Sequence, residues 1–265
     1  MSAERAYTSQ LGAGLGMIPE TLDLLRLWEP GMIGSQLAEQ AVETGMFSRT
    51  TARRARNLAV EMFAPRYLVS DGAVAARLRF LLDHGFSHDG LSQLFFLQTS
   101  RAHAILTDFI TTVYWPKYSA GASSLNKQDA TNFIHRAEDA GILRKKWSNS
   151  VVDNVSGYLL GCCIDFGLLG EGKRNERPIR RFSIRPDVAL YLAHDIHFAG
   201  ASDMDVVDGL DWRLFGLESQ DVLRLIQNLA HNGHLLIQAS ADLIQISWKY
   251  RTMEECLHAL VERQV

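Results

Sequence analysis

Apolar side chains recur every three or four residues along most of this chain, the spacing that turns one face of a helix toward a core. In the first half the pattern predicts six helices, over 19–28, 35–44, 48–63, 72–84, 88–99 and 101–114. Gly45 is expected to end the second helix, Ser48 or Thr50 to cap the third, and Trp115-Pro116 to break the sixth. Residues 1–120 therefore read as an all-helical domain.

A run of small residues at 119–124 indicates a domain boundary. Beyond it the pattern predicts helices over 126–140 and 148–166, then a hairpin that pairs 168–169 with 179–184. Helix, turn, helix and hairpin is the order of a winged helix, so we expect a winged-helix-like segment over 126–185. The remainder, 186–265, is predicted to contain helices over 186–198, 218–232 and 252–263 and a hairpin of 235–238 with 243–248.

These elements predict a mainly α fold with two domains, 1–120 and 121–265. The composition agrees with a folded, soluble protein, because 47% of the 265 residues are hydrophobic and 22% are charged. The longest stretch without Asp, Glu, Lys or Arg, 225–241, contains several amides and histidines, so it is poorly suited to span a bilayer. The first 19 residues lack the apolar core of a signal peptide. We therefore expect a cytoplasmic protein.

The net charge of −3 conceals an uneven distribution along the chain. Residues 126–186 contain 11 Lys and Arg against 7 Asp and Glu, whereas residues 187–265 contain 5 against 12. A second basic cluster, 49–66, lies within the neutral first part. Local fields of this kind decide whether a surface attracts phosphate. The sequence thus predicts two cationic patches in an otherwise acidic protein.

The first patch belongs to a predicted helix-turn-helix over 35–63. Arg49, Arg53 and Arg56 follow i, i+4, i+7 spacing and share a helical face opposite several alanines, a form suited to a DNA groove. The candidate DNA-binding residues here are Arg49, Thr50, Arg53, Arg54 and Arg56. The alternative is an arginine face that is merely solvated, or paired with acids such as Glu39 and Glu43.

The second patch surrounds the predicted winged helix. Its candidate DNA-binding residues are Arg144, Lys145, Lys146, Asn149, Lys173, Arg174, Arg177, Arg180 and Arg181. They precede the second helix or crowd the hairpin, a pattern typical of phosphate clamping. Asp153 and Asp165 would repel phosphate if they faced it, so sequence-specific readout is not expected. The alternative is a solvated loop or a dock for an acidic partner.

Catalytic and cofactor signals are weak. Gly12, Gly14 and Gly16 lack both the spacing and the preceding strand of a dinucleotide-binding loop. The pairs His194/His197 and His231/His234 have no companion ligands for a metal. Cys162, Cys163 and Cys256 fit small buried side chains better than a disulfide framework. We expect neither an enzyme nor a cofactor.

Several short segments carry a resemblance to a known family. They are Tyr7–Leu15, Glu20–Trp28, Pro30–Met32, Leu37, Ser48–Arg56 and Phe63–Tyr67. In these segments the chain resembles the BrxA family, accessory proteins of bacterial BREX phage-defence systems. The resemblance implies a cytoplasmic, non-enzymatic, mostly helical protein. It also implies binding to double-stranded DNA and service to a defence complex that contains a methyltransferase, an ATPase and a phosphatase-like component.

The leading hypothesis is a protein that binds duplex DNA mainly through its phosphate backbone, with the acidic C-terminal region contacting protein partners. One alternative is an adaptor that uses the same basic patches to dock acidic protein surfaces. Another is an autonomous transcriptional repressor, which requires a dimer and a palindromic operator.

Overall fold

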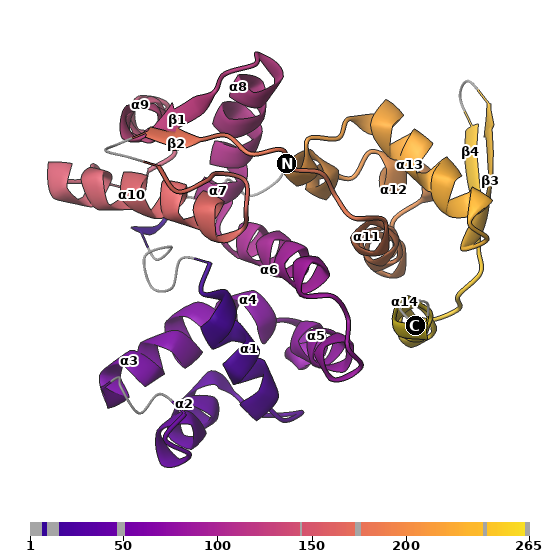
Figure 1. The fold of residues 1–265 in the computed structure, drawn as a ribbon, viewed down its shortest axis with the longest axis horizontal. Coiled ribbons are helices and arrows are strands. Elements are labelled where there is room, and N and C mark those ends of the chain that lie inside the picture. Colours follow the sequence, from indigo (N-terminus) through magenta and orange to yellow (C-terminus); the bar gives the residue numbers. More distant parts are fainter. Residues whose placement is uncertain are drawn as a thin grey trace. The chain divides into compact units, whose positions relative to one another are not determined.

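The computed structural model describes residues 7–9, 16–46, 51–143, 145–172, 176–240 and 243–262 (Figure 1). They form a mostly helical protein with two small antiparallel sheets of two strands each, which confirms the predicted mainly α class. The contacts form two compact units, 1–79 with 95–182 and 80–94 with 183–265. The helix-turn-helix and winged-helix assignments stay predictions, as does the division into domains at residue 121, because a compact unit need not fold independently.

The N-terminal helices of the first unit follow the predicted pattern. They are α1 (Ile18–Leu27), α2 (Gly34–Glu43) and α3 (Ala52–Arg56). Gly45 follows α2 with a φ of 63°, a left-handed conformation that glycine adopts without a steric penalty. The predicted cap of the third helix was wrong, because Thr51 is the N-cap and its Oγ1 accepts a hydrogen bond from the Arg54 amide.

The third helix does not stop at Phe63. It continues as a π-helical segment, η2 (Asn57–Phe63), and then as α4 (Ala64–Tyr67). The sixth predicted helix behaves likewise, with α7 (Ala104–Phe109), η4 (Ile110–Tyr114) and α8 (Trp115–Ser119). The expected break at Trp115-Pro116 is therefore wrong.

A shared physical reason explains both continuations. Proline lacks an N–H and its ring clashes with the carbonyl four residues earlier, which normally ends an α-helix. A π turn shifts the pairing to the fifth residue and so accommodates Pro65 and Pro116, each of which stands second in the α-helix that follows. Both segments therefore have the same order, a π-helical stretch followed by a short α-helix with proline at its second position.

The second half of the first unit contains β1 (Ser124–Asn126), α9 (Lys127–Asp139), α10 (Asn149–Asp165) and β2 (Glu176–Pro178). β1 pairs antiparallel with β2, and Leu169 forms a bridge with Ile179 beside them. The predicted hairpin was therefore too long, because 180–184 form no strand. The Arg180 amide donates a hydrogen bond to the Leu168 carbonyl, and the Tyr114 hydroxyl donates one to the Arg180 carbonyl. The strand pairing ends at this residue.

The chain passes between the units within α5 (Ala73–Asp83) and α6 (His88–Ala102). The second unit then contains α11 (Pro186–Phe198), α12 (Asp203–Val207), η5 (Leu210–Phe215), α13 (Ser219–His231), β3 (Leu235–Ser240), β4 (Leu243–Trp248) and α14 (Met253–Glu262). α11 is buried from Val188 to His194 and packs against α13 and α14. The helices and the hairpin predicted for 186–265 are confirmed.

Two buried histidines make the stability of the protein depend on pH. Burial, assisted by the nearby Arg66 charge, lowers the pKa of His103 to about 4, and burial also lowers the pKa of His194 to about 4. Both histidines are neutral when folded, whereas in the unfolded chain they take up a proton below about pH 6.5. Their contribution to stability is complete above pH 6.5 and is lost as the pH falls toward 4.

We therefore expect the free energy of unfolding in urea to fall between pH 7 and pH 5 by up to about 1.4 kcal/mol per pH unit for each histidine. His103→Gln and His194→Gln should each flatten this dependence while lowering stability at neutral pH. Unfolding curves for the parent and both variants at several pH values provide the measurement. A parent protein equally stable at pH 7 and pH 5 would contradict the expectation.

Candidate nucleic-acid interface

The first candidate patch lies on α3. Arg53 and Arg56 are exposed, Arg54 is half-buried and Ala55 is buried beneath them, so the helix turns its small residue inward and its charges outward. Within the described chain the side chain of neither Arg53 nor Arg56 makes a hydrogen bond or an ion pair. Ala52 was expected to face inward but is exposed. Arg49 and Thr50 lie outside the described residues.

A groove runs between α2 and α3. It has a volume of about 490 Å³ and is lined by Ser35, Ala38, Glu39, Val42, Glu43, Ala52, Arg53 and Arg56. The glutamates come from α2 and the arginines from α3, yet no ion pair joins them within the described chain. The groove therefore has an acidic wall on α2, a basic wall on α3 and an apolar floor, and its two glutamates and two arginines are not paired with one another.

The second candidate patch begins before α10. Lys145 and Lys146 are exposed in the preceding loop, with the Lys146 Nζ 3.6 Å from a Glu138 oxygen. Asn149 is exposed as the first residue of α10, which Ser148 caps by accepting a hydrogen bond from the Val151 amide. This arrangement places lysines and a helix N-terminus together, a combination that favours phosphate.

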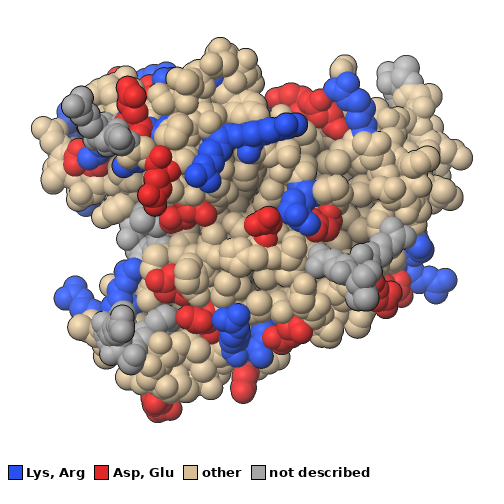
Figure 2. Space-filling view, viewed as in Figure 1, with Lys and Arg blue, Asp and Glu red and all other residues tan. Residues whose placement is uncertain are grey.

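The remaining basic residues lie on and after β2. Arg177 is half-buried, and its side chain donates to the Gly172 carbonyl at 3.0 Å, so part of its hydrogen-bonding capacity is used within the protein. Arg180 and Arg181 are exposed. On the face that Figure 2 shows, basic side chains gather near β2 with acidic side chains close by. Arg144, Lys173 and Arg174 lie outside the described residues.

Two carboxylates expected to oppose phosphate are engaged by the protein itself. Asp153 forms an ion pair with Lys127 of α9 at 2.6 Å, and Asp165 accepts a hydrogen bond from the Gly16 amide at 2.9 Å. Lys127 was not predicted from the sequence, because nothing in its local spacing points to Asp153. The Lys127 ion pair offsets the negative charge of Asp153 on α10.

The two basic patches are separate within the first unit. Figure 1 shows α3, which carries the first patch, apart from α10 and β2, which carry the second. A rod of regularly spaced phosphates can contact two such patches at once, whereas a single small anion cannot. Within the described ranges no group of three or more His, Cys, Asp or Glu side chains is placed to hold a metal ion. The arrangement is suited to binding charge along an extended partner.

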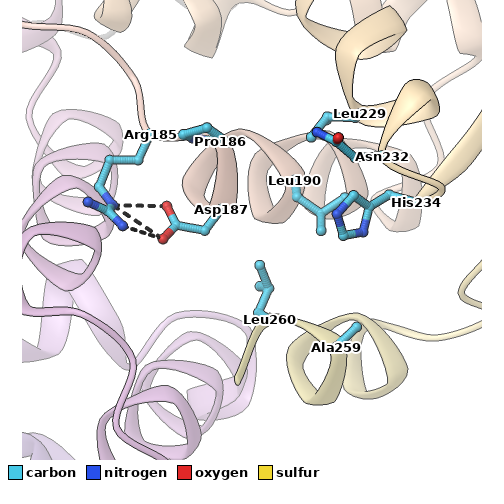
Figure 3. Close-up of a pocket in the computed structure, with 9 residues that line it drawn as sticks. All are labelled: Arg185, Pro186, Asp187, Leu190, Leu229, Asn232, His234, Ala259 and Leu260. Atoms are coloured by element: carbon cyan, nitrogen blue, oxygen red, sulfur yellow. Dashed lines mark hydrogen bonds and ion pairs between the residues drawn. The ribbon is translucent and has the colours of Figure 1, made fainter. Parts of the chain in front are cut away.

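A pocket of about 500 Å³ lies in the second unit (Figure 3). Arg185 points at Asp187 there, with Nε 3.0 Å from Oδ1 and Nη2 2.8 Å from Oδ2. Leu190, His234 and Leu260 line another part of it. Since Asp187 balances the Arg185 charge, this pocket does not extend the basic patches.

The histidines of the two pairs were predicted to be core or exposed residues, and their burial agrees with that prediction. His194 is buried with its Nδ1 2.9 Å from the Leu190 carbonyl, and His234 is buried with its Nδ1 3.1 Å from the Tyr250 hydroxyl. His197 stacks on Trp248, and His231 is exposed. The three cysteines are free and buried, as expected.

Comparisons with known proteins bear on the family and the fold. A family model described as BrxA matches residues 5–195. No curated protein matches the chain. The crystal structure of an uncharacterized protein from Magnetospirillum magneticum is similar at 13% sequence identity and a TM-score of 0.61, covering 79% of this chain and 98% of that one. At this identity the likeness shows the fold alone. No helix among the described residues is both long and apolar enough to cross a membrane.

Proposed function

This chain belongs to the BrxA family and is a BREX-associated defence protein, and on that premise we propose that it is a non-enzymatic protein that binds double-stranded DNA through the phosphate backbone. The observation that carries the proposal is the state of Arg53 and Arg56, which are exposed on one face of α3 with no partner in the described chain. Solvated guanidinium groups in such positions bind phosphate with release of counterions.

The order of elements in the first unit supports a second contact. Helix, β1, α9, α10 and β2, with β1 and β2 paired, follows the winged-helix order, in which the second helix of the pair and the hairpin loop approach DNA. The exposed side chains of this region are mostly basic or small and polar near the start of α10. We therefore propose that Lys145, Lys146, Asn149, Arg180 and Arg181 contact the backbone.

The acidic second unit is unsuited to DNA, because phosphate is repelled by its charge. Its segment 187–265 contains 12 acidic and 5 basic residues. We propose that this unit faces the protein components of the defence complex, which by family resemblance include a methyltransferase, an ATPase and a phosphatase-like protein.

The test is a fluorescence-anisotropy titration of the purified protein against several unrelated duplexes of about 30 base pairs, repeated across a salt series. We expect similar affinities for all the duplexes and a linear fall of log affinity with log salt concentration. Strong preference for a single duplex would contradict backbone readout. A protein that binds none of the duplexes at low salt would overturn the proposed function.

A second candidate function, a protein adaptor, is favoured by the groove between α2 and α3. Its apolar floor and its opposed Glu39 and Arg53 walls suit an amphipathic helix better than they suit a duplex. Val42 is 48% exposed at this groove, so Val42→Gln should leave the fold intact, and it leaves the net charge beside Arg53 and Arg56 unchanged. If the groove docks a protein, this variant loses its defence-complex partner in nuclease-treated pull-downs and keeps its DNA affinity.

A further inference from the structure

The groove between α2 and α3 holds exposed apolar side chains between charges of opposite sign. α2 packs against α3 (Figure 1), and this packing leaves Val42 of α2 48% exposed and Ala52 of α3 exposed at the groove. Apolar surface in a concave site gains stability when a partner removes it from water. The groove is therefore suited to a partner with an apolar face.

The dimensions of the groove indicate the form of that partner. The groove residues of α2 run from Ser35 to Glu43 and recur at helical spacing, so they occupy one face of the helix. At a rise of about 1.5 Å per residue this face is about 12 Å long, the length of about two turns of a helix lying alongside. A helix with an apolar stripe at the same spacing matches it.

The charges of the groove separate a protein helix from DNA as its occupant. Glu39 and Glu43 on the acidic wall repel phosphate, so a duplex reaches Arg53 and Arg56 only from their outer side. A helix with a row of acidic residues along one edge and basic residues along the other places each edge against the opposite charge. The complementary occupant is thus an amphipathic helix with two oppositely charged edges.

The basic wall of the groove consists of the same residues to which we assign the phosphate contacts of α3, namely Arg53 and Arg56. A guanidinium group that binds a carboxylate through paired hydrogen bonds no longer offers those donors to a phosphate. The carboxylates of the partner also bring negative charge to the place where DNA approaches.

We propose that a partner helix of this kind, seated in the α2–α3 groove, displaces α3 from DNA, so that the two binding events exclude one another at Arg53 and Arg56. This inference rests on the proposed DNA binding and adds its regulation by a protein partner. Because coupling between two ligands is reciprocal, DNA weakens the binding of the helix by the same factor.

A synthetic peptide of about 14 residues, which forms about four helical turns, serves as the probe. It has leucines at i, i+3, i+4 and i+7 spacing, glutamates along one edge and lysines along the other. A control peptide keeps the leucines and has lysines along both edges, so the basic wall repels it. Both peptides carry a fluorescent label and are titrated with the DNA-free protein by anisotropy.

We expect the first peptide to bind with a dissociation constant of about 10–100 µM, as is usual for a small contact, and the control peptide to bind about tenfold more weakly or less. A protein that binds neither peptide, or that binds both equally, overturns the proposal.

Competition is measured with a labelled duplex of about 30 base pairs at about 0.1 M salt, with and without a saturating concentration of the unlabelled first peptide. The peptide is expected to weaken DNA binding by up to about 60-fold, the loss that two phosphate contacts represent at this salt concentration. DNA binding that is insensitive to the bound peptide overturns this inference alone. A protein that binds no duplex even without peptide overturns the proposed function and this inference together.

Val42→Gln locates the competition in the groove, because it removes an exposed apolar contact without changing the charge. We expect it to bind the peptide about tenfold more weakly and to keep its DNA affinity when the peptide is added. Val69→Gln is the matched control, since Val69 is 42% exposed and lies outside the groove, and this variant should respond to the peptide like the parent. Equal competition in the two glutamine variants would show that the groove is not the site.

Two further variants make the test independent of Val42. Glu39→Gln combined with Glu43→Gln removes the acidic wall and should weaken peptide binding without weakening DNA binding. In Arg53→Gln combined with Arg56→Gln, the remaining DNA affinity should not respond to the peptide. A peptide that acted on the DNA itself would lower affinity in every variant, which would contradict the proposal. Circular dichroism establishes that each variant is folded before its binding is measured.

Discussion

Replacing Arg53 and Arg56 together by glutamine is expected to weaken binding to an unrelated duplex about 60-fold at about 0.1 M salt. Each phosphate contact contributes a factor that varies as the salt concentration to the power of about −0.9, which is about 8-fold at 0.1 M relative to 1 M. Losing two contacts should also reduce the slope of log affinity against log salt by about 1.8. Anisotropy titrations of the parent and the double variant across a salt series measure both effects.

The matched control is the double variant Arg213→Gln/Arg224→Gln. It removes the same amount of charge from two exposed positions in the acidic second unit. If only net charge matters, both double variants lose affinity equally, whereas a local contact at α3 predicts a large loss in the first alone. A folded α3 variant with unchanged affinity and slope would remove this helix from the interface and leave the region around α10 as the candidate.

Truncating Phe109 to alanine is expected to lower the free energy of unfolding by about 3–5 kcal/mol, the usual effect of removing a buried phenyl ring. Phe109 is fully buried at the end of α7, and its ring lies 5.5 Å from that of Phe133 on α9. Phe133 in turn lies 5.9 Å from the ring of Tyr7, so the truncation opens a cavity beneath the α9–α10 pair. Urea unfolding followed by tryptophan fluorescence measures the loss.

Phe109→Leu provides a graded comparison, because it retains most of the apolar volume and should cost much less than the alanine variant. Thr112→Ala, at an exposed position in η4, should change stability by less than about 1 kcal/mol. The binding measurement then separates two roles of the ring. If α10 contacts DNA, Phe109→Ala weakens DNA binding at temperatures where the protein remains folded. A Phe109→Ala protein as stable as the parent would contradict the packing described here.

The helices of this protein were largely predictable, because their information is local. α11 and α13 repeat apolar residues at helical spacing and are bounded by Pro186 and Gly233, so their limits differ little from those predicted. The charge of the basic and acidic segments could also be predicted, since it depends only on which residues each segment contains. The arginines of α3 could be placed on one face from their spacing, and the structure finds two of them exposed.

The departures occur where distant parts of the chain meet. A helix end was predicted at Trp115-Pro116, because the local spacing does not show that a π turn accommodates the proline. The predicted hairpin joined the strand near residue 179 only to residues 168–169. In the structure β2 pairs with β1, which lies about fifty residues earlier in the chain. Strands of three residues are too short to show an alternating pattern, so their partners depend on how the helices between them pack.

By itself, then, the amino-acid sequence determined the helical class, the positions of most helices, the uneven charge and the family resemblance, all of which depend on short-range spacing and residue type. Tertiary structure alone decided which charges are available. It engaged Asp153 with Lys127 and Asp165 with Gly16, and it left the side chains of Arg53 and Arg56 exposed on α3. The physical reason is that a hydrogen bond or ion pair requires two groups within about 3 Å, and the fold, not the local sequence, brings distant residues to that distance.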